Sequence, residues 1–192
     1  MLDAARQKAQ RRLTAINVSQ VPMDIFGMFD GRAMPERETG FDSSFEGQRV
    51  ADALCGVPRD AVTARLLHLE MESDCSVCIH FLSKDAFLYY LPAFISLVVE
   101  DFERLDLLPF TLVWYFTQHI DEGYGEDANP LSLAVLAELT PREADGLRWF
   151  ADYMRTHHQE EFLDGSLDRL DQVLETCPSE KAPAAGMGAR NS

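Results

Sequence analysis

The chain has 192 residues, enough for one domain with its own apolar core. Its 32 acidic and 17 basic residues give a formal net charge of -15. That balance argues against binding to nucleic acid or to an anionic membrane, because their phosphates would be repelled, but it suits a basic protein partner. The N-terminal stretch lacks the continuous apolar run of a secretory signal, so we expect a cytoplasmic protein whose four cysteines are reduced thiols.

The first forty residues predict one helix followed by turns. Residues 3–16 carry apolar side chains at helical spacing among four basic ones, which predicts an amphipathic helix that is unusually basic for this chain. Residues 17–40 are interrupted repeatedly by glycine and proline, so no long element is expected there.

Two short helices are predicted next. Ser43 followed by Glu46 matches a capping box, and Gly56 can end the helix that begins there through a left-handed conformation. Pro58 fits the first turn of a second helix, which should run to about Glu70. The following segment, 75–82, is rich in β-branched and aromatic residues but too short to assign as a strand.

The centre of the chain predicts a buried helix over Ser83 to Glu103. Ser83 can cap its start, and its apolar residues recur every three or four positions around most of the cylinder. Pro92 lies inside this helix, where a proline costs about 3 kcal/mol, so we expect a kink or two short helices that meet near Leu91. Charged residues crowd both ends, which leaves the apolar stretch too short to cross a bilayer.

The remainder of the chain predicts four more helices. Pro109 should open the first, residues 121–129 should form an exposed acidic loop, and the second should run over 130–139. The third has the clearest start, with Thr140 as N-cap and Glu143 at the third helical position, and the fourth should cover 167–175.

Together these elements predict a mainly α fold. We expect a single compact domain over residues 1–177, with about six to eight helices around a central kinked helix. From Pro178 the composition changes to proline, alanine, glycine and serine, which predicts a disordered tail over 178–192.

The candidate metal ligands are Cys75, Cys78 and His80. A C-x-x-C pair sets two thiolates at zinc-chelating spacing, and the histidine adds a third ligand. No second ligand pair follows, so the alternative is two buried thiols and a packed histidine. A weaker candidate is His157 with Glu161, four residues apart near the end of a helix.

No nucleophile elbow, phosphate-binding loop, dinucleotide fingerprint or zinc-protease motif occurs in the chain. Paired carboxylates such as Glu100 and Glu103 fit a solvated helix face better than an acid and base, because no apolar cleft separates their pKa values. The sequence therefore predicts a protein that is not an enzyme and needs no cofactor, zinc excepted.

Residues Phe81 to Phe94 read FLSKDAFLYYLPAF. This segment resembles an uncharacterised bacterial family whose members carry the pattern FLxxxAFxYYLPAF in a small helical domain. The resemblance extends from Phe45 and Val50 to residues 139–154, LTPREADGLRWFADYM. It implies a small helical fold and a bacterial origin. It implies no catalytic residue, because the shared positions are chiefly apolar, and the two cysteines of the C-x-x-C pair lie outside the pattern.

The charge and the missing motifs favour a non-enzymatic protein-binding protein, for example an immunity or antitoxin-type inhibitor that covers a basic toxin or nuclease. Two acidic runs are the expected contacts: Glu100, Asp101, Glu103 and Asp106, and Asp121, Glu122, Glu126 and Asp127. The alternatives are a zinc module or metal-dependent enzyme, and a housekeeping or regulatory domain whose charge is incidental.

Overall fold

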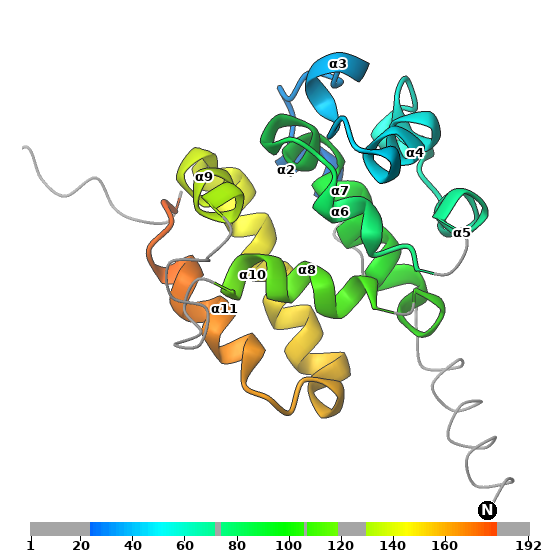
Figure 1. The fold of residues 1–192 in the computed structure, drawn as a ribbon. Coiled ribbons are helices and arrows are strands. Elements are labelled where there is room, and N and C mark those ends of the chain that lie inside the picture. The colour runs from blue at the N-terminus through cyan, green and yellow to red at the C-terminus, as the bar shows by residue number, and fades with distance from the viewer. Residues whose placement is uncertain (1–23, 72–73, 106, 119–129, 180–192) are drawn as a thin grey trace, which may run out of the picture.

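The apolar centre of the chain forms one buried helix, α7 (Lys84–Asp101), in the computed structural model of the protein, which describes residues 24–71, 74–105, 107–118 and 130–179 (Figure 1). The Oγ of Ser83 accepts a hydrogen bond from the backbone N–H of Ala86, as predicted for the cap. Residues 86–99 are all buried. The helix is continuous across Pro92, so the alternative of two short helices is wrong, while the kink stays a prediction.

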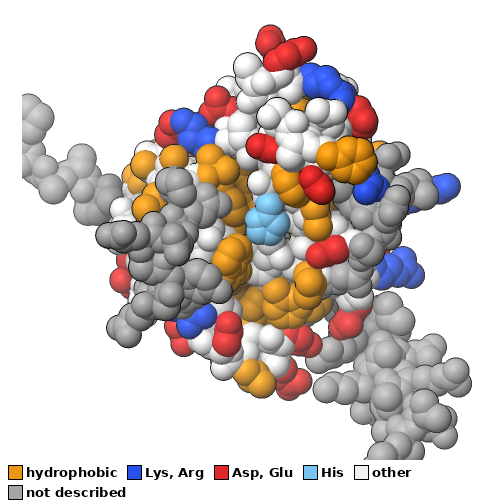
Figure 2. All heavy atoms as spheres, viewed as in Figure 1, with side chains coloured by type: hydrophobic (Ala, Val, Ile, Leu, Met, Phe, Trp, Pro, Cys, Tyr) orange, Lys and Arg blue, Asp and Glu red, His pale blue; other side chains and the backbone are white. Residues whose placement is uncertain are grey.

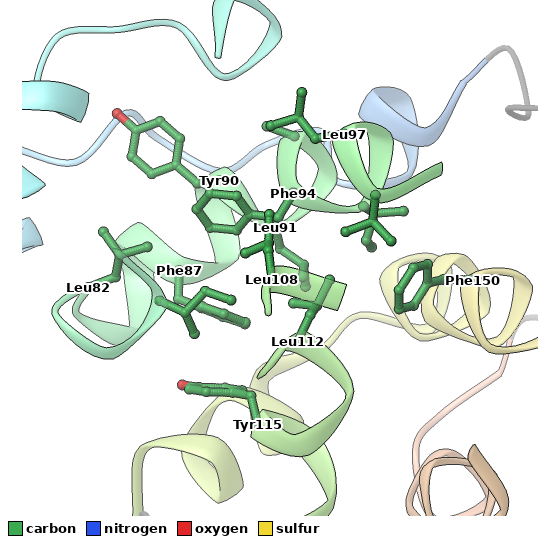
Figure 3. Close-up of a cluster of buried hydrophobic side chains, with 14 of the residues drawn as sticks. Leu82, Phe87, Tyr90, Leu91, Phe94, Leu97, Leu108, Leu112, Tyr115 and Phe150 are labelled. Atoms are coloured by element: carbon green, nitrogen blue, oxygen red, sulfur yellow. The ribbon is translucent and has the colours of Figure 1, made fainter. Parts of the chain in front are cut away.

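Aromatic and aliphatic side chains from several helices meet around α7 (Figure 3). The ring of Phe87 lies face to face with that of Tyr115 from α8 (Leu108–Thr117), with 4.2 Å between their centroids. Phe94 and Leu91 have no exposed surface, and Tyr89 is 8% exposed. The tyrosine and proline segment is therefore core, as predicted.

The N-terminal half consists of short helices: α2 (Ile25–Met28), α3 (Arg37–Gly40), α4 (Phe45–Leu54), η2 (Arg59–Ala61), α5 (Ala64–Met71) and α6 (Val77–His80). Helices α2 and α3 and the turn η2 contact α7, whereas α5 packs against α4. The helix predicted over residues 3–16 lies outside the described residues.

Two predictions in this half are wrong in detail. Helix α4 is capped by Ser44, whose Oγ accepts from Gly47 N, rather than by Ser43, although Gly56 does follow it with a φ of +76°. The single helix predicted from Pro58 to Glu70 is broken into η2 and α5. The segment 75–82 contains the turn α6 and one isolated β-bridge between Phe41 and Leu82.

The C-terminal half contains η3 (Phe102–Arg104), α8, α9 (Pro130–Glu138), α10 (Pro141–His158), η5 (Gln159–Glu161) and α11 (Ser166–Glu175). Helix α11 packs against both α8 and α10, and α9 packs against α7 and α8 (Figure 1). The helices predicted over 130–139 and 167–175 are confirmed, as is the proline in the first turn of α8.

The start of α10 is a complete capping box, as predicted. Thr140 Oγ1 accepts from Glu143 N at 3.2 Å, and Glu143 Oε2 accepts from Thr140 N at 2.8 Å. The carboxylate of Glu143 also forms an ion pair with Arg32, whose guanidinium donates to both carboxylate oxygens at 2.7 Å. The sequence analysis missed this buried ion pair.

The prediction of a mainly α domain is confirmed. The described residues form ten α-helices rather than six to eight, because three of them are four-residue turns that periodicity does not reveal. The first two residues of the predicted tail contact α10: Pro178 O accepts from Arg148, and Ser179 Oγ donates to Asp145 Oδ1. The rest of the predicted tail, 180–192, lies outside the described residues.

None of the described helices combines the length and apolar character needed to cross a membrane.

Two fully buried tyrosines differ in the hydrogen bonding of their hydroxyl groups. The hydroxyl of Tyr90 lies within hydrogen-bonding distance of the carbonyl oxygens of Leu54 and Val57. The hydroxyl of Tyr115 has no hydrogen-bond partner among the described residues. Burial raises the pKa of both hydroxyl groups, so both stay protonated.

Replacing each tyrosine by phenylalanine should therefore change stability in opposite directions. Tyr115→Phe removes a buried polar group that makes no bond, so we expect the free energy of unfolding to rise by up to about 1 kcal/mol. Tyr90→Phe removes the one hydroxyl donor that Leu54 O and Val57 O share, although Leu54 O still accepts from Val57 N, and should lower it by about 1 kcal/mol. Urea unfolding followed by far-UV circular dichroism measures both. Equal destabilisation by the two substitutions would contradict the assignment.

Candidate partner-binding cleft

A cleft of about 540 Å³ lies beside α6 and α8 and the segment that joins α10 to α11. Figure 2 shows the face that carries it, where hydrophobic side chains gather around a histidine and carboxylates lie among them. The apolar lining residues are Leu107, Phe110, Trp114, Phe162 and Leu163. The polar ones are His80, Thr111, Glu161, Asp164, Ser166 and Arg169.

The inner wall of the cleft is aromatic. The rings of Phe110 and Phe162 are 4.9 Å apart, and Phe102 lies behind them at 6.0 and 6.4 Å. Phe102 stacks in turn on His158 with a centroid distance of 3.8 Å. These contacts join η3, α8, the end of α10 and the residue after η5 into one aromatic wall, since aromatic pairs at such distances attract each other beyond simple burial.

The rim of the cleft carries two exposed leucines. Leu163 is 86% exposed and Leu107 is 56% exposed, and they are the two most exposed leucines among the described residues. Full burial of an apolar side chain of this size is favourable by about 1.5–3 kcal/mol relative to full exposure. Two of them beside an aromatic wall make an exposed apolar surface on this face.

The polar groups of the cleft are held in place by local bonds. Asp164 Oδ1 accepts from Ser166 N at 3.0 Å, and Arg169 Nη1 donates to the backbone oxygen of Asp164 at 2.9 Å. Burial raises the pKa of Asp164, but these hydrogen bonds and the charge of Arg169 outweigh it and hold the pKa below its ordinary value. The carboxylate is therefore ionised at neutral pH.

His80 forms one side of the cleft. Its ring meets Trp114 edge to face at 6.1 Å. Partial burial lowers the pKa of His80 despite the opposing effect of Asp74, so the ring is neutral at neutral pH. Among the described lining residues, the positive charge thus belongs to Arg169, which pairs with Asp164.

The structure does not join Cys75, Cys78 and His80 into a metal site. Both thiols are fully buried and donate to backbone oxygens, Cys75 to Leu105 and Cys78 to Cys75. Burial raises the pKa of the Cys78 thiol far above its ordinary value, which opposes the thiolate that zinc requires. His80 faces the cleft because residues two apart on a helical turn do not share a face. The part of the chain that the structure describes holds no group of three potential ligands.

The histidines near the end of α10 pack against aromatic rings. His157 lies 4.5 Å from Tyr153, and His158 stacks on Phe102. Helix α10 ends at His158 and η5 begins at Gln159, so His157 and Glu161 do not lie on one continuous α-helix. The spacing that suggested a metal pair is lost with the helix.

Three of the predicted contact residues lie within two residues of Phe102, and none of them lines the cleft. Glu100 and Glu103 are exposed and Asp101 is half-buried, and they flank Phe102 behind the aromatic wall. Glu100 accepts a hydrogen bond from Ser96 Oγ, and Asp101 pairs with Arg104. The other predicted contacts, Asp106, Asp121, Glu122, Glu126 and Asp127, lie outside the described residues.

Sequence reasoning missed most of the cleft. The helical spacing of Phe110 and Trp114 predicts a place on a large apolar helix face, and in the structure both are half-buried and line the cleft. Leu163 is the residue from which the cleft could have been predicted, since it is a large apolar residue in a connection between two helices. Comparison of the chain with known protein families, with curated proteins and with solved structures finds no match. The resemblance at residues 81–94 therefore stays a prediction.

Proposed function

We propose that the protein is a non-enzymatic binding protein that attaches to a basic protein partner through the cleft between α8 and the start of α11. The exposure of Leu163 and Leu107 beside an aromatic wall carries this proposal. Hydrophobic anchors at the centre of a contact surface supply most of the binding energy, whereas surrounding charges set the partner and the rate of encounter.

The charge of the protein selects a basic partner. Carboxylates border the cleft at Glu161 and Asp164. With a net charge of -15, the chain attracts a positively charged protein at long range. An inhibitor that covers a basic toxin or nuclease is the specific form of this proposal.

Affinity capture with a matched pair of variants tests the proposal. Leu163→Asp places a charge on the rim of the cleft, and Leu133→Asp places one on α9, where the parent leucine is 47% exposed but outside the cleft. The parent protein and Leu133→Asp should retain a basic protein at low salt and release it at high salt, because salt screens the attraction. Leu163→Asp should lose at least tenfold in retention, about 1.4 kcal/mol. Retention that is indifferent to Leu163, or no basic protein at all, contradicts the proposal.

A further inference from the structure

The N-terminal segment has the composition expected of a ligand for the cleft. Residues 1–23 hold four of the 17 basic residues and one of the 32 acidic ones, in a chain that is otherwise strongly acidic. Within 3–16, the apolar residues Ala5, Ala9, Leu13 and Ile16 recur at helical spacing. The segment therefore combines an apolar stripe with positive charge, which is the complement of an apolar cleft bordered by carboxylates.

We propose that residues 3–16 dock in the cleft of their own chain and occupy the surface that a basic partner would take. This inference rests on the proposed function of the cleft. In this arrangement Leu13 and Ile16 would contact the apolar rim, and the arginines of the segment would lie near Glu161 and Asp164. An amphipathic helix that lays its apolar face into a groove is a common mode of peptide recognition.

The connection is long enough to reach the cleft. The described chain begins at Asp24, whose carboxylate pairs with Arg142 at the start of α10. The cleft begins at Glu161, just beyond the other end of that 18-residue helix, about 27 Å away along its axis. Residues 17–23 can span about 25 Å when extended, and the docked segment itself adds about 20 Å more.

Docking has a defined effect on the partner. A segment that occupies the cleft reduces the fraction of chains that can bind, so the apparent affinity for a basic partner falls by that fraction. Being tethered, the segment acts at a high effective concentration, and even weak contacts are sufficient to fill the cleft. The segment would act as an internal competitor that a tighter basic partner displaces.

The fluorescence of Trp114 reports on the cleft directly. The chain has two tryptophans, and Trp149 does not line the cleft, so Trp149→Phe leaves one reporter at the site. In that background, Leu13→Asp combined with Ile16→Asp should shift Trp114 emission to longer wavelength and increase its quenching by acrylamide. Gln7→Asp is the matched control, because it adds a carboxylate on the opposite face of the segment and should leave the emission unchanged.

The outcomes separate this inference from the proposed function. An emission spectrum that the double substitution does not alter overturns the docking, even if capture still depends on Leu163. A spectrum of the Trp149→Phe protein that changes with its concentration overturns docking within one chain and points to a second copy. A shifted emission together with capture that ignores Leu163 supports the docking and overturns the proposed function alone. Release of the segment should also raise the retention of the basic partner.

Discussion

Replacing Phe87 by alanine should lower the free energy of unfolding by about 3–5 kcal/mol. Phe87 has no exposed surface, and its ring lies 4.2 Å from Tyr115 and 5.8 Å from Phe116. The substitution removes the apolar contacts and leaves a cavity between α7 and α8 that neighbours cannot fill without moving. Because domains of this size are stable by only about 5–15 kcal/mol, the loss is a large part of the total.

Phe45 is the matched control for this substitution. It is the first residue of α4 and is 72% exposed, so Phe45→Ala should change stability by no more than about 0.5 kcal/mol. Urea unfolding of both variants, followed by circular dichroism at constant pH, gives the two differences. Similar losses for Phe45 and Phe87 would show that α7 is not the packing centre of the fold.

The parts of the fold that follow from local chemistry could be predicted from the sequence. Ser83 and Thr140 cap their helices as expected, because an N-cap bond involves residues only three apart. The burial of α7 was also predictable, since an apolar surface around most of a helix leaves it no stable place except among other helices.

A local turn and a tertiary contact accompany the two features that were not predicted. Helix α4 begins one residue later than predicted: Ser44 has the extended backbone of a cap, and Asp42 Oδ1, two residues earlier, accepts from Ser44 N at 2.8 Å. The break between η2 and α5 lies at Val62 and Thr63, where Thr63 Oγ1 accepts from Leu66 N at 3.2 Å. Arg59, the first residue of η2, donates to Phe29 O at 2.8 Å, a contact between residues 30 positions apart. Local propensity carries no information about such contacts.

The cleft as a whole could not be predicted from the sequence either, because it is formed by elements that are far apart in the chain. Apolar residues at helical spacing predict burial, so the sequence alone does not show that Phe110 and Trp114 border a cleft. The arrangement of α6, α8 and α11 shows it. The described residues do not bring the predicted metal ligands together, and the reason is geometric. Cys78 and His80 are two positions apart, and one helical turn sends the thiol into the core and the imidazole into the cleft.

Replacing Glu143 by glutamine should lower the free energy of unfolding at pH 7 by about 3 kcal/mol. Glu143 is 1% exposed, and both of its oxygens accept from Arg32 at 2.7 Å. Glutamine keeps an acceptor for the backbone N–H of Thr140 but removes the charge that compensates the guanidinium. The matched control is Asp52→Asn, which breaks the exposed pair with Arg37 and should cost less than about 1 kcal/mol.

The pH dependence identifies the charge as the cause. Burial raises the pKa of Glu143, but the bonds from Arg32 and Thr140 outweigh it and hold the pKa below its ordinary value. A carboxyl whose pKa is lowered by folding stabilises the protein fully above its unfolded-state pKa of about 4.3 and loses that contribution as the pH falls through the folded value. The stability difference between the parent and Glu143→Gln should therefore shrink as the pH is lowered from 7 toward 3. A difference that stays constant over this range would show that glutamine perturbs packing or the helix cap, because neither of those costs depends on the ionisation of residue 143.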